Sequence, residues 1–142
     1  MQKISSKIPD ILFYNLPNTN SYRMLDWKKS AYIGEMSVNK RNELFLESFH
    51  IHHEHRRRGY GKKFLDFAVN LSKRLGLNGN LRVLAALTPK DMNNSPHIFY
   101  RKYGFTSDNK HIIKEIDTAI KNKQQLDPYN TPHLYMYYIN NE

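Results

Sequence analysis

Residues 56–63, with the sequence RRRGYGKK, are the part of this chain whose residue types point most directly to chemistry. Two glycines stand among five cations at the start of a predicted helix. The first backbone N–H groups of a helix have no intrahelical partner, and the aligned peptide dipoles place partial positive charge there, so phosphate binds readily. Glycine permits unusual φ values and lets a ligand approach the backbone. We therefore expect a polyanionic ligand at this Gly-turn.

The spacing within the Gly-turn separates it from two common nucleotide-binding motifs. A P-loop needs glycine where Arg56 stands, and it needs Ser or Thr where Lys63 stands, to hold magnesium. The dinucleotide fingerprint needs a third small residue where the chain has Phe64. The chain is therefore not a P-loop NTPase, and a nicotinamide or flavin enzyme is disfavoured.

Composition narrows the class of protein. A chain of 142 residues suits one domain, so we expect a single domain over 1–142. The absence of cysteine excludes disulfides, a thiolate nucleophile and thiolate metal sites.

Lys and Arg number 22 against 13 acidic residues, which gives a net charge of +9. This charge favours an anionic partner such as nucleic acid, a membrane surface or an anionic cofactor. No apolar run approaches the roughly 18 residues of a membrane span, and no secretory region is evident, so we expect a cytoplasmic protein with no membrane partner.

The elements that must position the Gly-turn follow from hydrophobic periodicity and turn residues. Strands are predicted over 21–26, 31–38, 43–51, 81–87 and 133–139, and helices from Gly59 to Gly76, over 97–103 and over 110–125. The order strand, helix, strand around the Gly-turn implies a parallel pair joined by a right-handed crossover.

The strand before the Gly-turn has apolar residues at both parities. Phe45, Phe49 and Ile51 share one parity, and Leu44 and Leu46 share the other. This pattern predicts a central strand that is covered on both faces.

Two motifs then occur in order with a predicted strand between them. Residues 56–61 match R/Q-x-x-G-x-G/A, and Asn93 with residues 99–105 (FYRKYGF) matches N-x(5)-[LF]-Y-x-x-x-G-F. Over roughly 31–105 the chain resembles the GNAT superfamily of N-acetyltransferases. The resemblance implies an α/β fold in which a mixed central β-sheet is flanked by helices and two parallel strands splay apart.

The resemblance also implies a co-substrate, acetyl-CoA, and the residues that hold it. The backbone of Phe49 and Ile51 would pair with the pantetheine arm, the Gly-turn would hold the pyrophosphate, and Asn93 would face the cofactor. The implied cofactor-binding residues are Phe49, Ile51, Arg56, Arg57, Arg58, Gly59, Tyr60, Gly61, Lys62, Asn93 and Tyr100.

Acetyl transfer to an amine needs a deprotonated nucleophile, stabilisation of the oxyanion and a proton for the departing thiolate. No cysteine and no Ser-His-Asp pattern is evident, which favours direct attack in a ternary complex. By the resemblance Tyr100 is the general acid beside the sulfur, the alternative being that it only packs. Glu47 is the expected general base, with Glu43 at the same parity and a water chain as alternatives.

Residues 50–55 (HIHHEH) form a second conspicuous cluster. Imidazoles on one strand face can bind zinc or nickel, but exposed loop histidines are the ordinary alternative, and we expect no metal. Arg101 and Lys102 are further candidates for the phosphates of CoA.

The sequence therefore predicts an acetyl-CoA-dependent N-acetyltransferase acting on a primary amine. The acceptor stays open among a small molecule, a protein amine and aminoacyl-tRNA, and a homodimer is left open. The alternative is a non-catalytic basic module on the same fold that binds CoA or nucleic acid, for which Tyr135, Tyr137 and Tyr138 would supply stacking aromatics.

The chain departs from the family pattern in two places. The resembled family usually has two helices between its first two strands, whereas about 30 residues precede Ala31 here. Its members also commonly run directly into a hairpin where this chain has the predicted helix over 110–125.

Overall fold

The computed structural model describes residues 10–56, 58–87 and 95–141. In chain order the elements are β1 (Ile11–Asn15), β2 (Ser21–Asp26), β3 (Ala31–Lys40), β4 (Leu44–Ile51), the 3-10 helix η1 (His53–His55), α1 (Tyr60–Arg74), β5 (Leu81–Ala85), α2 (Pro96–Tyr103), α3 (Lys110–Lys121) and β6 (Leu134–Tyr138). Within the part of the chain that is described, no helix combines the length and the apolar character needed to cross a membrane.

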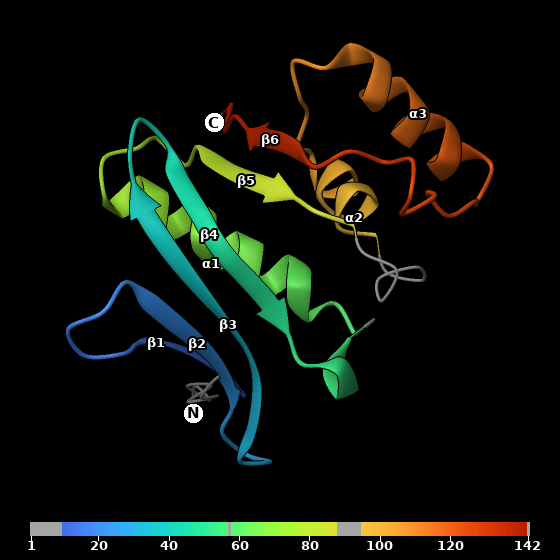
Figure 1. The fold of residues 1–142 in the computed structure, drawn as a ribbon. Helices are drawn as coiled ribbons and strands as arrows, with labels where there is room; N and C mark the ends of the chain where they lie inside the picture. The colour runs from blue at the N-terminus through green and yellow to red at the C-terminus, as the bar shows by residue number, and fades with distance from the viewer. Residues whose placement is uncertain (1–9, 57, 88–94, 142) are drawn as a thin grey trace, which may run out of the picture.

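The six strands form one sheet in the order β1-β2-β3-β4-β5-β6. All neighbours are antiparallel except β4 and β5, which run parallel and are joined through α1. Figure 1 shows α1 running behind the strands, with α2 and α3 gathered at the β6 end. The predicted α/β fold, with a mixed central sheet flanked by helices, is confirmed.

The apolar faces of the sheet and of α1 meet in one core. Phe64, Leu65 and Ala68 of α1 are fully buried, at the helical spacing that the sequence predicted. They pack with apolar strand residues such as Met24 and Met36, both also fully buried. Burying these side chains provides the main free energy that holds α1 against the sheet.

The edge strand β1 was not predicted from the sequence. It pairs with β2 along its whole length, and the Phe13 ring stacks on that of Phe67 in α1 with the centroids 4.6 Å apart. Because these partners lie far apart in the sequence, no local sequence pattern indicates the contact. The turn after β1 leads directly into β2, with no helix between the two strands.

The prediction that Phe45 and Phe49 share a face of β4 is wrong, because β4 contains a bulge. Ser37 pairs with Ser48 and Val38 pairs with Leu46, so Glu47 is an extra residue without a partner in the ladder. A bulge of one residue reverses the side-chain parity beyond it. Leu44, Leu46, Phe49 and Ile51 consequently all pack against the core, whereas the Phe45 ring lies near Tyr135 with its centroid 6.3 Å away.

The prediction that β4 is covered on both faces is wrong, because one face of this part of the sheet is exposed. On the face away from α1 several side chains are exposed, among them Ser48, His50, Leu84 and Tyr135. We call this the open face of the sheet.

The parallel strands β4 and β5 separate soon after they meet. Their pairing consists of three residue pairs, from Leu44 with Leu81 to Leu46 with Val83. β4 continues to Ile51 and β5 to Ala85, and beyond the paired residues the two strands line a common cavity. This is the splayed pair that the resemblance implied.

Some predicted boundaries shift by a few residues. β3 extends to Lys40, β5 ends at Ala85, and α3 ends at Lys121 rather than at 125. The residues after Lys121 turn back, with Lys123 in the left-handed region at φ 53°.

Candidate functional site

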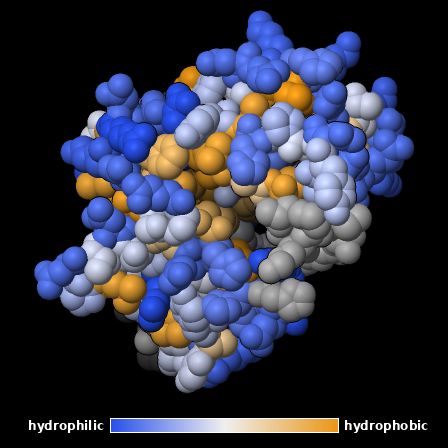
Figure 2. Space-filling model, viewed as in Figure 1, coloured by the Kyte–Doolittle hydropathy of each residue, from blue (hydrophilic) through white to orange (hydrophobic). Residues whose placement is uncertain are grey.

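A cavity of about 1020 Å³ opens where β4 and β5 part. Its walls come from the splayed strand ends, the start of α1, one side of α2 and the end of α3. Figure 2, in the same view as Figure 1, shows a hollow lined by apolar side chains on this side of the molecule, with hydrophilic side chains around it. This volume is at the upper end of the range of small-molecule sites in proteins.

The Gly-turn forms one end of the cavity. Gly59 has φ 79°, the left-handed conformation that favours glycine, and it caps α1 without a side chain over the first turn. The first turn of α1 contains no acidic residue, and Lys62 from this turn lines the cavity. Backbone donors, helix dipole and a cation thus converge where an anion would bind.

Gly61 has a different role from the one that the sequence suggested. It lies within α1, and among the described residues its φ is not one of the positive values. A Cβ at this position would lie 2.7 Å from Cζ of Phe99, so the small residue allows α1 and α2 to meet.

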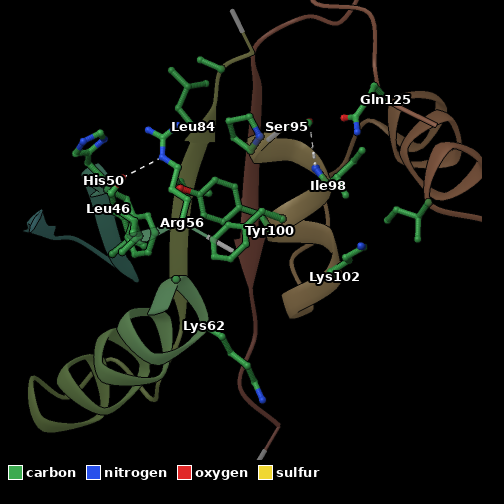
Figure 3. A pocket seen from close by; sticks show the side chains of 18 of the residues that line it. Leu46, His50, Arg56, Lys62, Leu84, Ser95, Ile98, Tyr100, Lys102 and Gln125 are labelled. Carbon is green, nitrogen blue, oxygen red and sulfur yellow. Dashed lines mark hydrogen bonds between the residues drawn. The ribbon is translucent and has the colours of Figure 1, made fainter. Parts of the chain in front are cut away.

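Aromatic side chains form the floor of the cavity. The Phe49 ring lies 5.5 Å from Phe64, 6.0 Å from Phe99 and 6.2 Å from Tyr100, measured between ring centroids. These rings hold Tyr100 in place at 5% exposure. Figure 3 shows Tyr100 reaching from α2 across the cavity toward β4.

The hydroxyl of Tyr100 has no hydrogen-bond partner within the described ranges, and its residue lines the cavity. Burial raises the pKa of Tyr100 far above that of an ordinary phenol. Tyr100 is therefore protonated at any working pH and offers a hydrogen-bond donor to a group in the cavity.

The β4 side of the cavity is polar. Arg56 donates a hydrogen bond from Nε to the carbonyl oxygen of Ile51 over 3.0 Å, which holds the guanidinium against the end of the strand. His50 lies beside Arg56 in Figure 3, and both residues line the cavity. Glu47, the bulge residue, is exposed and is the one carboxylate among the lining residues that are described.

The end of α3 supplies a wall that sequence reasoning did not anticipate. Ile120, Lys123 and Gln125 line the cavity, and Figure 3 shows Gln125 beside Ile98 of α2. α3 is held by Ile112 and Ile116, which are buried in the core, and by Arg101, which donates from Nε and Nη2 to the Asp117 carboxylate over 2.7 and 3.0 Å. Arg101 is thus engaged in packing α2 against α3, whereas Lys102 lines the cavity.

The cavity brings together most of the residues expected from the sequence. The predicted residues that line it are Glu47, Phe49, Ile51, Arg56, Gly59, Gly61, Lys62 and Tyr100. Arg58 is exposed outside the lining, and Tyr60 is outside it as well, with its ring 6.2 Å from that of His55. Arg57 and Asn93 lie outside the described residues.

The sequence groups His50 with the other histidines as a metal candidate, whereas the structure places it in the cavity lining. The strand alternation of β4 is the sequence signal for that position. In the described part of the chain, no three His, Cys, Asp or Glu side chains come close enough together to hold a metal ion. The His50 and His52 rings lie 5.5 Å apart, and the His52 ring lies 4.4 Å from Tyr32.

The sequence and the structure of this chain were compared with those of known proteins. A family model described as an acetyltransferase (GNAT) domain matches residues 25–107, which is more than half of the chain. A search of curated protein sequences finds no significant match.

Solved structures share the fold. Nourseothricin acetyltransferase is 21% identical, with a TM-score of 0.55, over 86% of this chain and 65% of that one. The PaiA N-acetyltransferase from Thermoplasma acidophilum, in complex with coenzyme A, is 18% identical with a TM-score of 0.55, over 92% and 62% of the two chains. A Bacillus subtilis acetyltransferase in complex with CoA is 15% identical with a TM-score of 0.53, over 84% and 76%. The chain spans about 65% of the length of the first structures that it matches.

Proposed function

The chain belongs to the GNAT acetyltransferase family, and from that premise we propose that it moves an acetyl group from acetyl-CoA to a primary amine. The observation that carries this proposal is the cavity between β4 and β5, which joins the anion-binding start of α1 to the buried Tyr100. The fold-related PaiA and Bacillus subtilis proteins are complexes with CoA, which supports the same cofactor here.

The proposed cofactor would lie along the cavity from the Gly-turn to the strand gap. Its pyrophosphate would sit on the first-turn amides of α1, with Lys62 as the adjacent cation. His52 donates its backbone N–H to the Ile33 carbonyl oxygen on the β3 side of β4. Alternation along β4 turns the backbone N–H and C=O groups of Ile51 and Phe49 toward the gap. The Ile51 carbonyl oxygen already accepts from Arg56, so pantetheine amides could pair with the Ile51 N–H and with both groups of Phe49.

In the proposed reaction the amine attacks the thioester carbonyl directly, in a ternary complex. A backbone N–H facing the gap would polarise the carbonyl, and Tyr100 would donate a hydrogen bond to the sulfur as the C–S bond breaks. The raised pKa of Tyr100 keeps its proton in place until a thiolate develops. Glu47 lines the same cavity and is the acidic candidate for the general base.

The acceptor is a primary amine whose class the proposal leaves open. The experiment that tests the function has two stages. Calorimetry should detect binding of acetyl-CoA, and a screen of polyamines, aminoglycosides, peptide amines and aminoacyl-tRNA with thiol detection should find an acceptor that releases CoA. Binding without turnover on any amine would favour the non-catalytic CoA module, and no binding of acetyl-CoA would overturn both.

A further inference from the structure

The two sides of the cavity present different chemistry, because successive residues of β4 point to opposite faces of the sheet. Phe49 pairs across the sheet with the fully buried Met36 and packs against the rings of α1 and α2. His50, the next residue, pairs with Glu35 and is exposed on the open face. Both residues line the same cavity, so the gap between β4 and β5 reaches through the sheet.

A direct attack needs an acid near the departing sulfur and a base near the attacking amine. Tyr100 and the Gly-turn occupy the side formed by α1 and α2, so the bound cofactor would fill that side. The amine would then approach from the open face, where a base must take its proton. His50 is the imidazole that β4 places at this position.

Resting on the acetyltransferase function proposed above, we infer that His50 is the general base that takes the proton from the attacking amine. In the reaction step the amine nitrogen forms the N–C bond, and the resulting ammonium gives one proton to the neutral imidazole of His50. The C–S bond breaks, and the sulfur receives the proton of the Tyr100 hydroxyl. Solvent then removes the proton from His50 and restores the one lost by Tyr100.

The surroundings of His50 keep its imidazole neutral and ready to accept a proton. Partial desolvation lowers the pKa of His50 below its ordinary value of 6.5, and the Arg56 charge and His52 lower it further. Glu35 on β3 acts in the opposite direction with a smaller effect. Glu47 on the same strand and His55 before the Gly-turn are the other titratable residues of the lining on this side.

Neighbouring side chains also limit how the His50 ring can turn. Its ring meets that of His52 edge-on, and the His52 ring in turn meets Tyr32 edge-on. The Tyr32 hydroxyl donates a hydrogen bond to Glu35 over 2.8 Å. His50 is itself exposed, so it can release its proton to solvent after each turnover.

Imidazole is better matched than a carboxylate to proton transfer near neutral pH. Glu47 also lies at a bulge, outside the strand ladder that fixes the direction of His50. We therefore expect substitution of His50 to cost more activity than substitution of Glu47.

The first test compares His50→Gln and Glu47→Gln with a matched control, His111→Gln, which changes an exposed histidine of α3 outside the cavity. With acetyl-CoA and the fastest amine of the screen, kcat of His50→Gln should fall about 100-fold, the usual contribution of a general base. Acetyl-CoA affinity should be unchanged in calorimetry, and His111→Gln should match the unaltered protein. The pH profile of kcat/KM should also lose its acid limb in His50→Gln alone.

Chemical rescue separates a base from a residue that only shapes the cavity. Added imidazole should restore turnover to His50→Ala and leave Tyr100→Phe unimproved. Failure of rescue, together with a larger loss in Glu47→Gln, would assign the base to Glu47 and overturn the inference while the acetyltransferase function stands.

A second readout needs no acceptor. The imidazole C2 proton of His50, assigned by its loss in His50→Gln, should titrate below 6.5 in NMR spectra. The resonance should also shift when acetyl-CoA saturates the protein, because the cofactor would lie in the same cavity. A resonance that saturating acetyl-CoA leaves in place would overturn the inference, whereas a failure of acetyl-CoA to bind would overturn the proposed function itself.

Discussion

Gly61 of α1 lies directly against the ring of Phe99 in α2, so close that a Cβ on Gly61 would be 2.7 Å from Cζ and 2.9 Å from Cε1. The contact joins the first turn of α1 to the helix that carries Tyr100. Since Phe99 also lines the cavity, a methyl group at Gly61 would alter the shape of the Gly-turn end of the cavity.

Gly61→Ala should weaken acetyl-CoA binding without unfolding the protein. The added methyl must displace the Phe99 ring, and we expect the dissociation constant measured by calorimetry to rise about 10-fold, which corresponds to about 1.4 kcal/mol. Alanine is a better helix former than glycine by up to about 1 kcal/mol. This gain offsets part of the steric strain, so the thermal unfolding temperature should change little.

Gly59→Ala is the matched comparison for Gly61→Ala. Its Cβ would meet nothing within 4 Å, but φ is 79°, so the change strains the backbone without filling space. We expect a loss of about 1 kcal/mol of stability. An unchanged acetyl-CoA affinity in Gly61→Ala would contradict the role given to the Phe99 contact.

Tyr100→Phe should lower turnover about 100-fold and leave acetyl-CoA affinity nearly unchanged, because the ring keeps its packing and only the proton donor is lost. Steady-state kinetics beside calorimetry would measure the two effects. Tyr103→Phe, in the same helix, is the control: its hydroxyl donates to Asp66 over 2.7 Å, so that variant should lose stability and keep turnover. Equal turnover in Tyr100→Phe and the unaltered protein would remove Tyr100 from the chemistry.

Asp117→Asn should loosen α3 from α2 by removing one partner of Arg101. The pair is partly exposed, at 27% and 48% for the two side chains, so a loss of only about 0.5 kcal/mol is expected in urea unfolding. The hydrogen bond from Arg101 lowers the pKa of Asp117. Its stabilisation is therefore complete above the unfolded pKa of about 3.9 and is lost as pH falls through the lower folded value.

Glu115→Gln provides the control for Asp117→Asn, because it removes an acid of α3 that pairs with the exposed His111 in the same helix. Equal losses in the two variants would mean that net charge, and not the contact between the helices, accounts for the effect.

His97 should make the protein less stable below neutral pH. The side chain is fully buried in α2, with Nε2 at 2.9 Å from the carbonyl oxygen of Pro132. Burial lowers the pKa of His97, so the unfolded chain binds a proton that the folded protein resists. Stability is then complete above the unfolded pKa of about 6.5 and declines as pH falls toward the lower folded value.

Denaturant unfolding at pH 7 and pH 5 would measure the contribution of His97. The difference in unfolding free energy between the two pH values should shrink in His97→Gln and persist in His111→Gln. Equal pH dependence in His97→Gln and the unaltered protein would contradict the assignment.

Local sequence determined the elements that depend on short-range chemistry. Gly59 marks the start of α1 because the left-handed cap there favours glycine. Ser95 and Pro96 mark the start of α2, where the Ser95 hydroxyl accepts the N–H of Ile98, and Gly104 marks its end. The two motifs on these helix ends were sufficient to identify the family and to propose the cofactor.

The tertiary structure alone decided which side chains share the cavity. The bulge at Glu47 moved Phe49 to the core face and His50 to the open face, because one extra residue reverses every later side chain in a strand. α3 reaches the cavity because Ile112 and Ile116 pack in the core and Arg101 pairs with Asp117, contacts between residues separated in sequence and joined in space. Such contacts depend on how whole elements pack. Local sequence therefore determined the helix ends and the residue types on them, whereas packing determined which side chains line the cavity of the proposed reaction.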